Sequence, residues 1–162
     1  MLGWLAALVL ILRFAPASGT LAVALGWLAL YRLQDLFFGT ISDAFIFQSA
    51  AGSWQSKVVM AIMNLAQVVI IFAIAFLVFT PGTAFHPSAP PSRFGHLYLS
   101  WNILPVLGSG FAAATVRARV LVMIESAVGF PLAAIALGRL VSGLGSGAEA
   151  SEPDPAARPR GS

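Results

Sequence analysis

The sequence predicts an all-α integral membrane protein, and its composition and two long apolar runs are the observations that predict it. Of the 162 residues, 59% are hydrophobic and only 9% are charged, and the mean hydropathy is +0.89. A soluble domain carries about 25% charged residues, so this chain has too little polar surface for a water-soluble globule. The length suits one small domain. We therefore expect a multi-pass protein of the cell membrane, in contact with membrane lipid.

The composition also excludes several classes of function. The sequence has no cysteine, which excludes disulfides, a thiol nucleophile and Cys-ligated metals. The formal net charge is +3, but the basic residues are scattered and do not form the clustered face that nucleic acid requires. No nucleophile–base pair and no cluster of metal ligands is visible. We therefore predict no enzyme activity, no catalytic residue, no cofactor and no metal.

Residues 1–32 contain two short apolar runs, at residues 2–12 and 21–31. The first is too short to cross a membrane as a straight helix. Pro16, followed by Ser18 and Gly19, is typical of a turn and favours a hairpin of two short helices that turns at residues 15–19. The alternative is one tilted, proline-interrupted span over residues 2–31. A third interpretation is that the start codon is assigned too far downstream, in which case the first helix is a truncated one.

Residues 33–57 mix apolar side chains such as Phe37 and Phe38 with polar ones such as Asp35 and Asp43. This mixture predicts a helix that lies in the membrane interface, followed by a connector near residue 50. A plain connector throughout is the alternative.

Residues 58–79 form the first long run and contain no charge. At about 1.5 Å per residue, a helix of this length crosses the hydrocarbon core of about 30 Å. Lys57 precedes the run, and Thr80 and Pro81 end it. Its only strongly polar members, Asn64 and Gln67, share a helix face, and we expect them to form hydrogen bonds between helices.

The segment at residues 81–96 has four prolines and predicts a surface loop. It also holds both histidines, His86 and His96. They are too far apart in sequence, and too few, to predict a metal site.

The second long run lies within the predicted span 118–141, between Arg119 and Arg139. Glu125 lies inside this run, and an ionisable residue at that depth is costly. Pro131 is expected to bend the helix. Small residues four apart, which allow close helix approach, are Gly129 with Ala133 and Ala134 with Gly138. Residues 144–162 are rich in Gly, Ser, Ala, Pro and charge, which predicts a disordered tail.

Residues 97–111 lie between the two long runs and form a third kind of segment. About nine residues, 97–105, have helical character and would extend only about 14 Å, half a membrane. The Gly108-Ser109-Gly110 turn follows. A half-helix and a glycine turn between two spans predict a re-entrant loop, which requires surrounding protein or a water-filled cavity.

Residues 58–143 resemble the pore module of the potassium-channel superfamily, in particular small bacterial two-transmembrane channel-like proteins. Leu99-Ser100-Trp101 is similar to the start of the family's pore helix. Leu107-Gly108-Ser109-Gly110 stands where the filter's Val-Gly-Tyr-Gly would be. The run I-E-S-A-V-G, with Glu125 and Gly129, is similar to the family's L-E-A-x-x-G, and A-L-G-R-L-V resembles its terminal A-R-L-V.

The resemblance implies a homotetrameric pore for a monovalent cation. It implies a hinge at Gly129 and a filter-like segment made of Val106, Leu107, Gly108, Ser109 and Gly110. The filter is atypical, because Pro105 and Val106 replace two threonines, Ser109 replaces the tyrosine and Phe111 replaces an acid. Since threonine and backbone oxygens replace the water shell of potassium, the residues favour a pore more than potassium selectivity. The alternative is a non-conducting channel-fold protein that acts as a structural or regulatory partner.

The family layout also suggests a role for Glu125, as a brace against the back of the pore helix near Ser100 or Asn102. The alternative is that its carboxylate reaches toward Arg117 or Arg119 at the membrane surface. In the same layout the proline-rich loop faces outward and the tail is cytoplasmic. The charges on the loops do not decide the orientation.

Overall fold

The computed structural model describes residues 2–14, 16, 18–45, 54–80, 82–86, 92–103 and 112–149. Its elements, in chain order, are α1 (Leu2–Phe14), α2 (Thr20–Phe45), α3 (Trp54–Phe79), a 3-10 turn η1 (Gly82–Ala84), β1 (Phe85–His86), α4 (Arg93–Ile103), β2 (Ala112–Ala113) and α5 (Val116–Glu149). Three segments are long and apolar enough to cross a membrane: Thr20–Ser42, Gln55–Phe79 and Val116–Ser142. The chain is thus an all-α protein with the composition of a multi-pass membrane protein.

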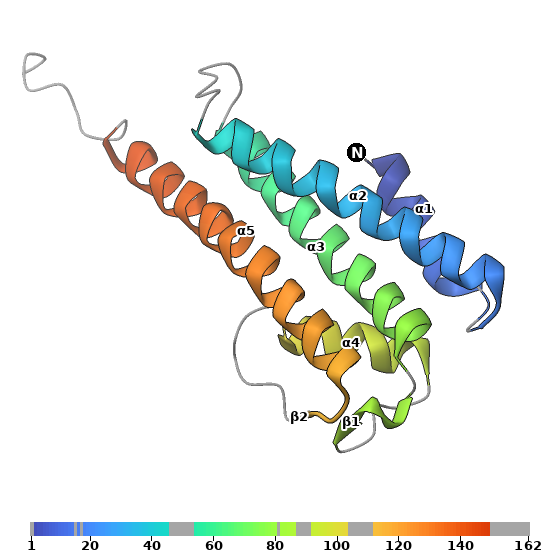
Figure 1. Ribbon diagram of the computed structural model, residues 1–162. Coiled ribbons are helices and arrows are strands. Elements are labelled where there is room, and N and C mark those ends of the chain that lie inside the picture. Colours follow the sequence, from blue (N-terminus) through green and yellow to red (C-terminus); the bar gives the residue numbers. More distant parts are fainter. Residues whose placement is uncertain are drawn as a thin grey trace, which may run out of the picture.

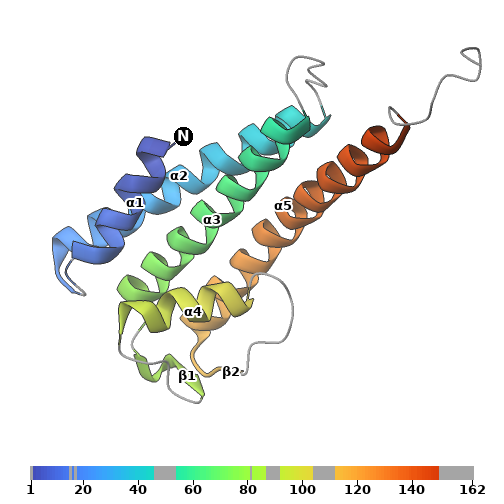
Figure 2. The same ribbon diagram turned by 180° about the vertical axis from the view of Figure 1, so that it is seen from behind.

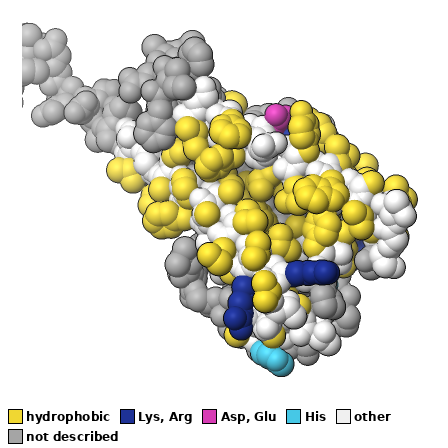
Figure 3. Space-filling view, in the orientation of Figure 1, with side chains coloured by type: hydrophobic (Ala, Val, Ile, Leu, Met, Phe, Trp, Pro, Cys, Tyr) yellow, Lys and Arg dark blue, Asp and Glu magenta, His cyan; other side chains and the backbone are white. Residues whose placement is uncertain are grey.

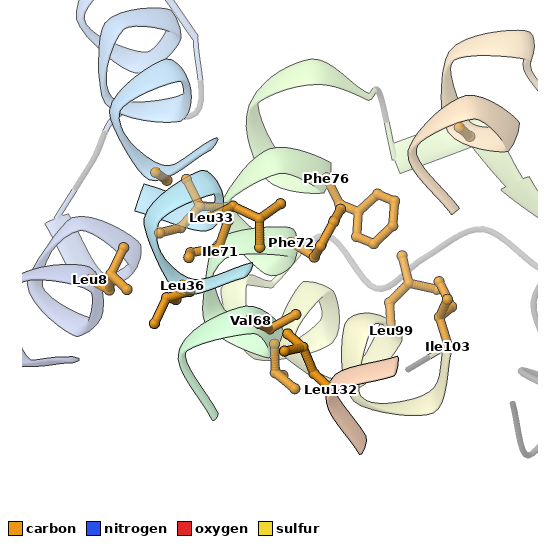
Figure 4. Close-up of a cluster of buried hydrophobic side chains, with 14 of the residues drawn as sticks. Leu8, Leu33, Leu36, Val68, Ile71, Phe72, Phe76, Leu99, Ile103 and Leu132 are labelled. Atoms are coloured by element: carbon orange, nitrogen blue, oxygen red, sulfur yellow. The ribbon is translucent and has the colours of Figure 1, made fainter. Parts of the chain in front are cut away.

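Helix α3 is the centre of the molecule, and α1, α2, α4 and α5 all pack against it (Figures 1 and 2). Its most deeply buried stretch is residues 67–76, apart from the half-buried Ile70. Figure 4 shows how the other helices meet it: Leu8, Leu33, Leu36, Leu99 and Leu132 converge on Phe72 and its neighbours. The most hydrophobic helix is therefore the one around which the rest assemble.

Local signals define the ends of the central helices. Thr80 ends α3, because its hydroxyl donates to Phe76 O at 2.6 Å and the following Pro81 disfavours further helix. Ser92 caps α4, since its Oγ accepts from Gly95 N at 3.0 Å, and Thr115 Oγ1 accepts from Ala118 N at the start of α5. Such side-chain acceptors satisfy the free N–H groups of a helix start.

A small antiparallel pair of strands joins the two ends of the segment that contains α4. Phe85 of β1 is paired with Ala113 of β2, and His86 with Ala112. Beside this pair, Ala114 N donates to Ala84 O at 2.8 Å. The chain that leaves α3 is therefore tied to the chain that enters α5, at the same end of the molecule as α4 (Figure 1).

The N-terminal part differs from the prediction in the second helix. The chain breaks between α1 and α2, where Gly19 has a φ of 100°, a conformation that glycine adopts without steric cost. However, α2 does not end near Arg32. It continues to Phe45, so residues 33–45 extend a candidate membrane span and are not a separate interfacial helix. The apolar side chains of this stretch, such as Leu33 and Leu36, pack into the core.

Two other boundaries also differ. Helix α4 begins at Arg93, so residues 93–96 belong to the helix and not to the predicted loop, because Ser92 provides an N-cap. Helix α5 extends to Glu149, beyond the predicted tail boundary at residue 144. Each residue added to an existing helix gains a backbone hydrogen bond, and the sequence has no proline between Pro131 and Pro153 to stop it.

The outer surface is as apolar as the composition requires. Figure 3 shows hydrophobic side chains over most of one face, with Lys and Arg at the end that carries β1 and β2. Exposed large apolar residues occur on every long helix, for example Trp27, Val59 and Phe130. A surface of this kind suits contact with hydrocarbon.

Gly26 gives a test of the packing between α2 and α3. A Cβ at this position would lie 2.9 Å from Cζ of Phe79 and 3.3 Å from Cγ1 of Val78. We expect Gly26→Val to lower the free energy of unfolding by about 1–3 kcal/mol, the usual cost of overpacking. Gly39→Val is the matched control in the same helix, because a Cβ there has no atom within 4 Å. Equal stability of the two variants, in a detergent unfolding titration, would contradict the packing.

Candidate functional site

Helix α4 is about half a membrane long and packs against both α3 and α5. Its 11 residues extend about 16 Å at 1.5 Å per residue. The buried side includes His96, Leu99, Ser100 and Ile103. The helix ends at Ile103, and Ala112 and Ala113 are in a strand. A continuous helix from Leu97 to Ala114 is therefore excluded.

The contact between α4 and α5 includes a buried hydrogen bond. Ser100 Oγ donates to Glu125 Oε1 at 2.5 Å, and both residues are 0% exposed. The carboxylate thus lies inside the protein and does not face lipid. Its second oxygen, Oε2, is buried and has no hydrogen-bond partner among the residues that the structure describes. A buried polar atom without a partner is costly, so Ser100 is the principal polar support of this side chain.

The structure distinguishes between the residues considered as partners of Glu125. Asn102 Nδ2 donates at 2.6 Å to Tyr98 O, in its own helix, and so does not share the contact. Arg119 Nε donates to Ala113 O at 3.1 Å, which ties the start of α5 to β2. Glu125 therefore bonds the back of α4 and not the arginine at the end of its own helix.

The filter-like residues Val106, Leu107, Gly108, Ser109 and Gly110 lie outside the described residues, as do Pro105 and Phe111. Their predicted backbone geometry stays a prediction. The elements on either side of this segment are described: α4 ends at Ile103 before it, and β2 begins at Ala112 after it.

Gly129, the predicted hinge, lies within α5 and is buried. The helix is continuous through both Gly129 and Pro131. Proline inside a helix removes one backbone hydrogen bond, so α5 has a local weakness at Pro131, six residues after Glu125. Movement about Gly129 stays a prediction.

The two polar residues of α3 have different environments. Asn64 Nδ2 donates to Thr40 Oγ1 of α2 at 3.0 Å, which is the expected bond between helices. Gln67 is 0% exposed, and neither polar atom of its side chain has a partner within the described part of the chain. The expectation is therefore confirmed for Asn64 alone.

The two histidines have different environments. His96 is buried and its Nδ1 lies 3.0 Å from Ser92 O, in the first turn of α4. His86 is exposed on β1. Among residues 2–149, where these are described, no group of three His, Asp or Glu side chains is placed to hold a metal ion.

Two features near α4 were not predicted from the sequence. Arg93 Nη1 donates to Leu12 O at 3.1 Å, so the start of α4 is tied to the end of α1. An apolar groove of about 340 Å³ lies between α3 and α4. The sequence contains a signal for the groove, because the spacing of Phe94, Tyr98 and Trp101 places three aromatic side chains on one helix face. The contact of Arg93 depends on the tertiary structure alone. The residues that line the groove are Ala66, Val69, Ile70, Phe94, Leu97, Tyr98 and Trp101.

Substitutions of Glu125 test the Ser100 contact. Glu125→Leu leaves the Ser100 hydroxyl buried without an acceptor, and we expect a loss of about 1–3 kcal/mol in unfolding free energy. Glu125→Gln retains an oxygen that accepts from Ser100 and should lose less. The measurement is a double-mutant cycle with Ser100→Ala in a detergent unfolding titration. A coupling of at least about 0.5 kcal/mol is expected for residues in contact, and simple additivity would show that the hydrogen bond contributes nothing.

No protein-family model, curated protein or solved structure matches this chain. The relation to potassium channels therefore depends on the residues of this sequence and on the arrangement of α3, α4 and α5, and we treat it as a proposal.

Proposed function

We propose that the chain forms a homotetrameric pore for monovalent cations, with α3 as outer helix, α4 as pore helix and α5 as inner helix. The observation that carries this proposal is the position of α4. A helix of half-membrane length packs against two membrane-length helices, and the Ser100–Glu125 hydrogen bond ties it to α5. A channel needs such a support, because irregular backbone at membrane depth must be surrounded by protein or water.

The chemistry of residues 106–110 supports a pore with weak selectivity. Gly108 and Gly110 retain the conformational freedom that an ion-lining backbone requires. The positions of the threonine ligands are Pro105 and Val106, which offer no hydroxyl. Selectivity for potassium depends on the number and type of coordinating oxygens. We therefore expect passage of both potassium and sodium, with little discrimination.

The surface of α5 supports assembly. Most of the side chains of this helix that are described are exposed or half-buried in the single chain. Met123, Phe130 and Leu137 are each more than 60% exposed. In a tetramer, the inner helices of four chains would cover part of this surface and enclose the cavity below the filter-like segment.

A second candidate is a non-conducting protein that retains the pore architecture and acts as a structural or regulatory partner. Pro105 and Val106 are the specific observation in its favour. Proline also lacks the N–H group, which further separates this segment from a conducting filter. This candidate shares the tetramer and differs only in ion passage.

The deciding experiment is ion flux in liposomes that contain the purified protein, together with the mass of the assembly in mild detergent. A tetramer with potassium and sodium flux supports the conducting pore. A tetramer without flux supports the second candidate, and a monomer without flux excludes both.

A variant of the filter-like segment sharpens the flux measurement. Gly108→Val should abolish flux and leave the tetramer intact, because a branched side chain disfavours the backbone angles that only glycine adopts readily. Gly39→Val adds the same side chain in α2, far from this segment in sequence, and should conduct as the wild type does. Flux that persists in Gly108→Val would show that ions do not pass through residues 106–110.

A further inference from the structure

Two contacts determine how α2 and α3 lie alongside each other. Asn64 Nδ2 donates to Thr40 Oγ1 at 3.0 Å, and the backbone of Gly26 lies against Val78. Gly26 is fourteen residues before Thr40, and Val78 is fourteen residues after Asn64. The two helices are thus antiparallel and keep one register over this whole length.

This register gives the depth of a charged pair in α2. Asp35 is five residues before Thr40 and is therefore level with Val69, at the middle of the uncharged run 58–79 of α3. Arg32 Nη1 donates to Asp35 Oδ2 at 3.0 Å in an ion pair. With α3 crossing a membrane, this register would place the pair near the middle of the hydrocarbon core, where ionisable side chains are rare and are treated as functional by default.

Asp35 of this pair belongs to a polar stripe on the outward face of α2. Tyr31, Gln34 and Asp35, here called the midplane stripe, are three and four residues apart and so share one helix face. Tyr31 is 64% exposed, Gln34 is exposed and the side chain of Asp35 is 55% exposed. Arg32 is covered, because its guanidinium lies 5.2 Å from the Trp4 ring of α1.

Lipid tails cannot form hydrogen bonds with the midplane stripe. A hydroxyl, an amide and a carboxylate that face hydrocarbon at that depth are costly. Polar side chains on membrane helices instead bond to each other across helix pairs. We propose that the midplane stripe is the surface through which two copies of this chain pair, with their α2 helices parallel.

The chemistry of the stripe selects a second copy as the occupant. Two copies enter the membrane in the same orientation, so their stripes meet at the same depth. A tyrosine hydroxyl and a glutamine amide each donate and accept, so each can bond to its counterpart across a two-fold axis. Arg32 already neutralises Asp35, so no net charge on the stripe selects a basic helix of another protein.

This contact does not depend on the proposed pore. Helix α3 lies between α2 and most of α5 (Figures 1 and 2), so pairing through α2 leaves the exposed face of α5 available. The two proposals therefore fail separately: loss of the α2 contact does not alter ion flux, and absence of flux does not alter the α2 contact.

The absence of cysteine from the sequence makes oxidative cross-linking a clean test. Phe38 is one turn from Gln34 on the same face and is 64% exposed, so Phe38→Cys retains all three stripe residues. Oxidation of this variant in liposomes should give a band of doubled mass, since a disulfide requires Cβ atoms within about 4.5 Å. Leu10→Cys is the control, because Leu10 is 57% exposed on α1 and should give no such band.

A second substitution links the cross-link to the stripe. Adding Gln34→Leu to Phe38→Cys should reduce the yield of dimer roughly three- to twentyfold, which is the range expected from hydrogen bonds between membrane helices. The proposal is overturned if Phe38→Cys gives no dimer, or if Gln34→Leu leaves the yield unchanged. Labelling of the cysteine by a membrane-impermeant thiol reagent would also overturn it, because the stripe would then face water. A cross-link in cell membranes only to a protein of another mass would do the same.

Discussion

The packing of every other helix against α3 holds the molecule together. Helix α3 has no charge between Lys57 and its end, and its buried stretch is almost entirely apolar. In water such a surface would drive folding by the hydrophobic effect, but lipid tails are equally apolar. Close packing between side chains must therefore supply much of the stability. Phe72 and Phe76, whose ring centroids are 6.5 Å apart, lie between Leu33 of α2 and Leu99 of α4 (Figure 4).

Polar contacts decide which helix faces which on this apolar centre. Thr40 and Asn64 align α2 with α3, and Ser100 and Glu125 align α4 with α5. Each contact joins residues of two different helices, 24 and 25 positions apart in the sequence. In a low-dielectric interior an unmade hydrogen bond is more costly than in water, so even one polar pair favours a single register. The same constraint makes the exposed midplane stripe of α2 difficult to explain in a single chain surrounded by lipid.

The arrangement of α4 is what connects the fold to a function. An isolated helix of 11 residues is marginally stable, so α4 depends on its N-cap at Ser92, the contact of Arg93 with α1, and its buried face against α3 and α5. These supports hold a short helix at a defined position at the end of two long ones. The segment that follows it, residues 104–111, is the one whose residues resemble a filter, and the function we propose depends on that segment.

Much of the fold could be predicted from the sequence, because the hydrophobic runs are long and their ends carry strong local signals. Residues 58–79 predict a membrane span, with Lys57 before it and Pro81 after it. Helix α3 contains this whole span and ends at the predicted residue. The prediction failed for α2, where Asp35 and Asp43 suggested that the chain leaves the membrane after Arg32. The cost of Asp35 is offset in part, because it forms an ion pair with Arg32, and Arg32 in turn lies against Trp4 of α1, a contact that the sequence does not reveal.

The sequence by itself determined that this is a helical membrane protein, where its central span lies and that Glu125 requires a polar partner, because these conclusions depend only on composition, length and the cost of burying charge. Only the tertiary structure decided that the partner is Ser100 and not Asn102, because this depends on the rotation of α4 about its axis. It also decided that α2 is continuous and that its ion pair lies level with the middle of α3. The level of the ion pair is a consequence of the register between α2 and α3, which a pattern along one chain does not contain.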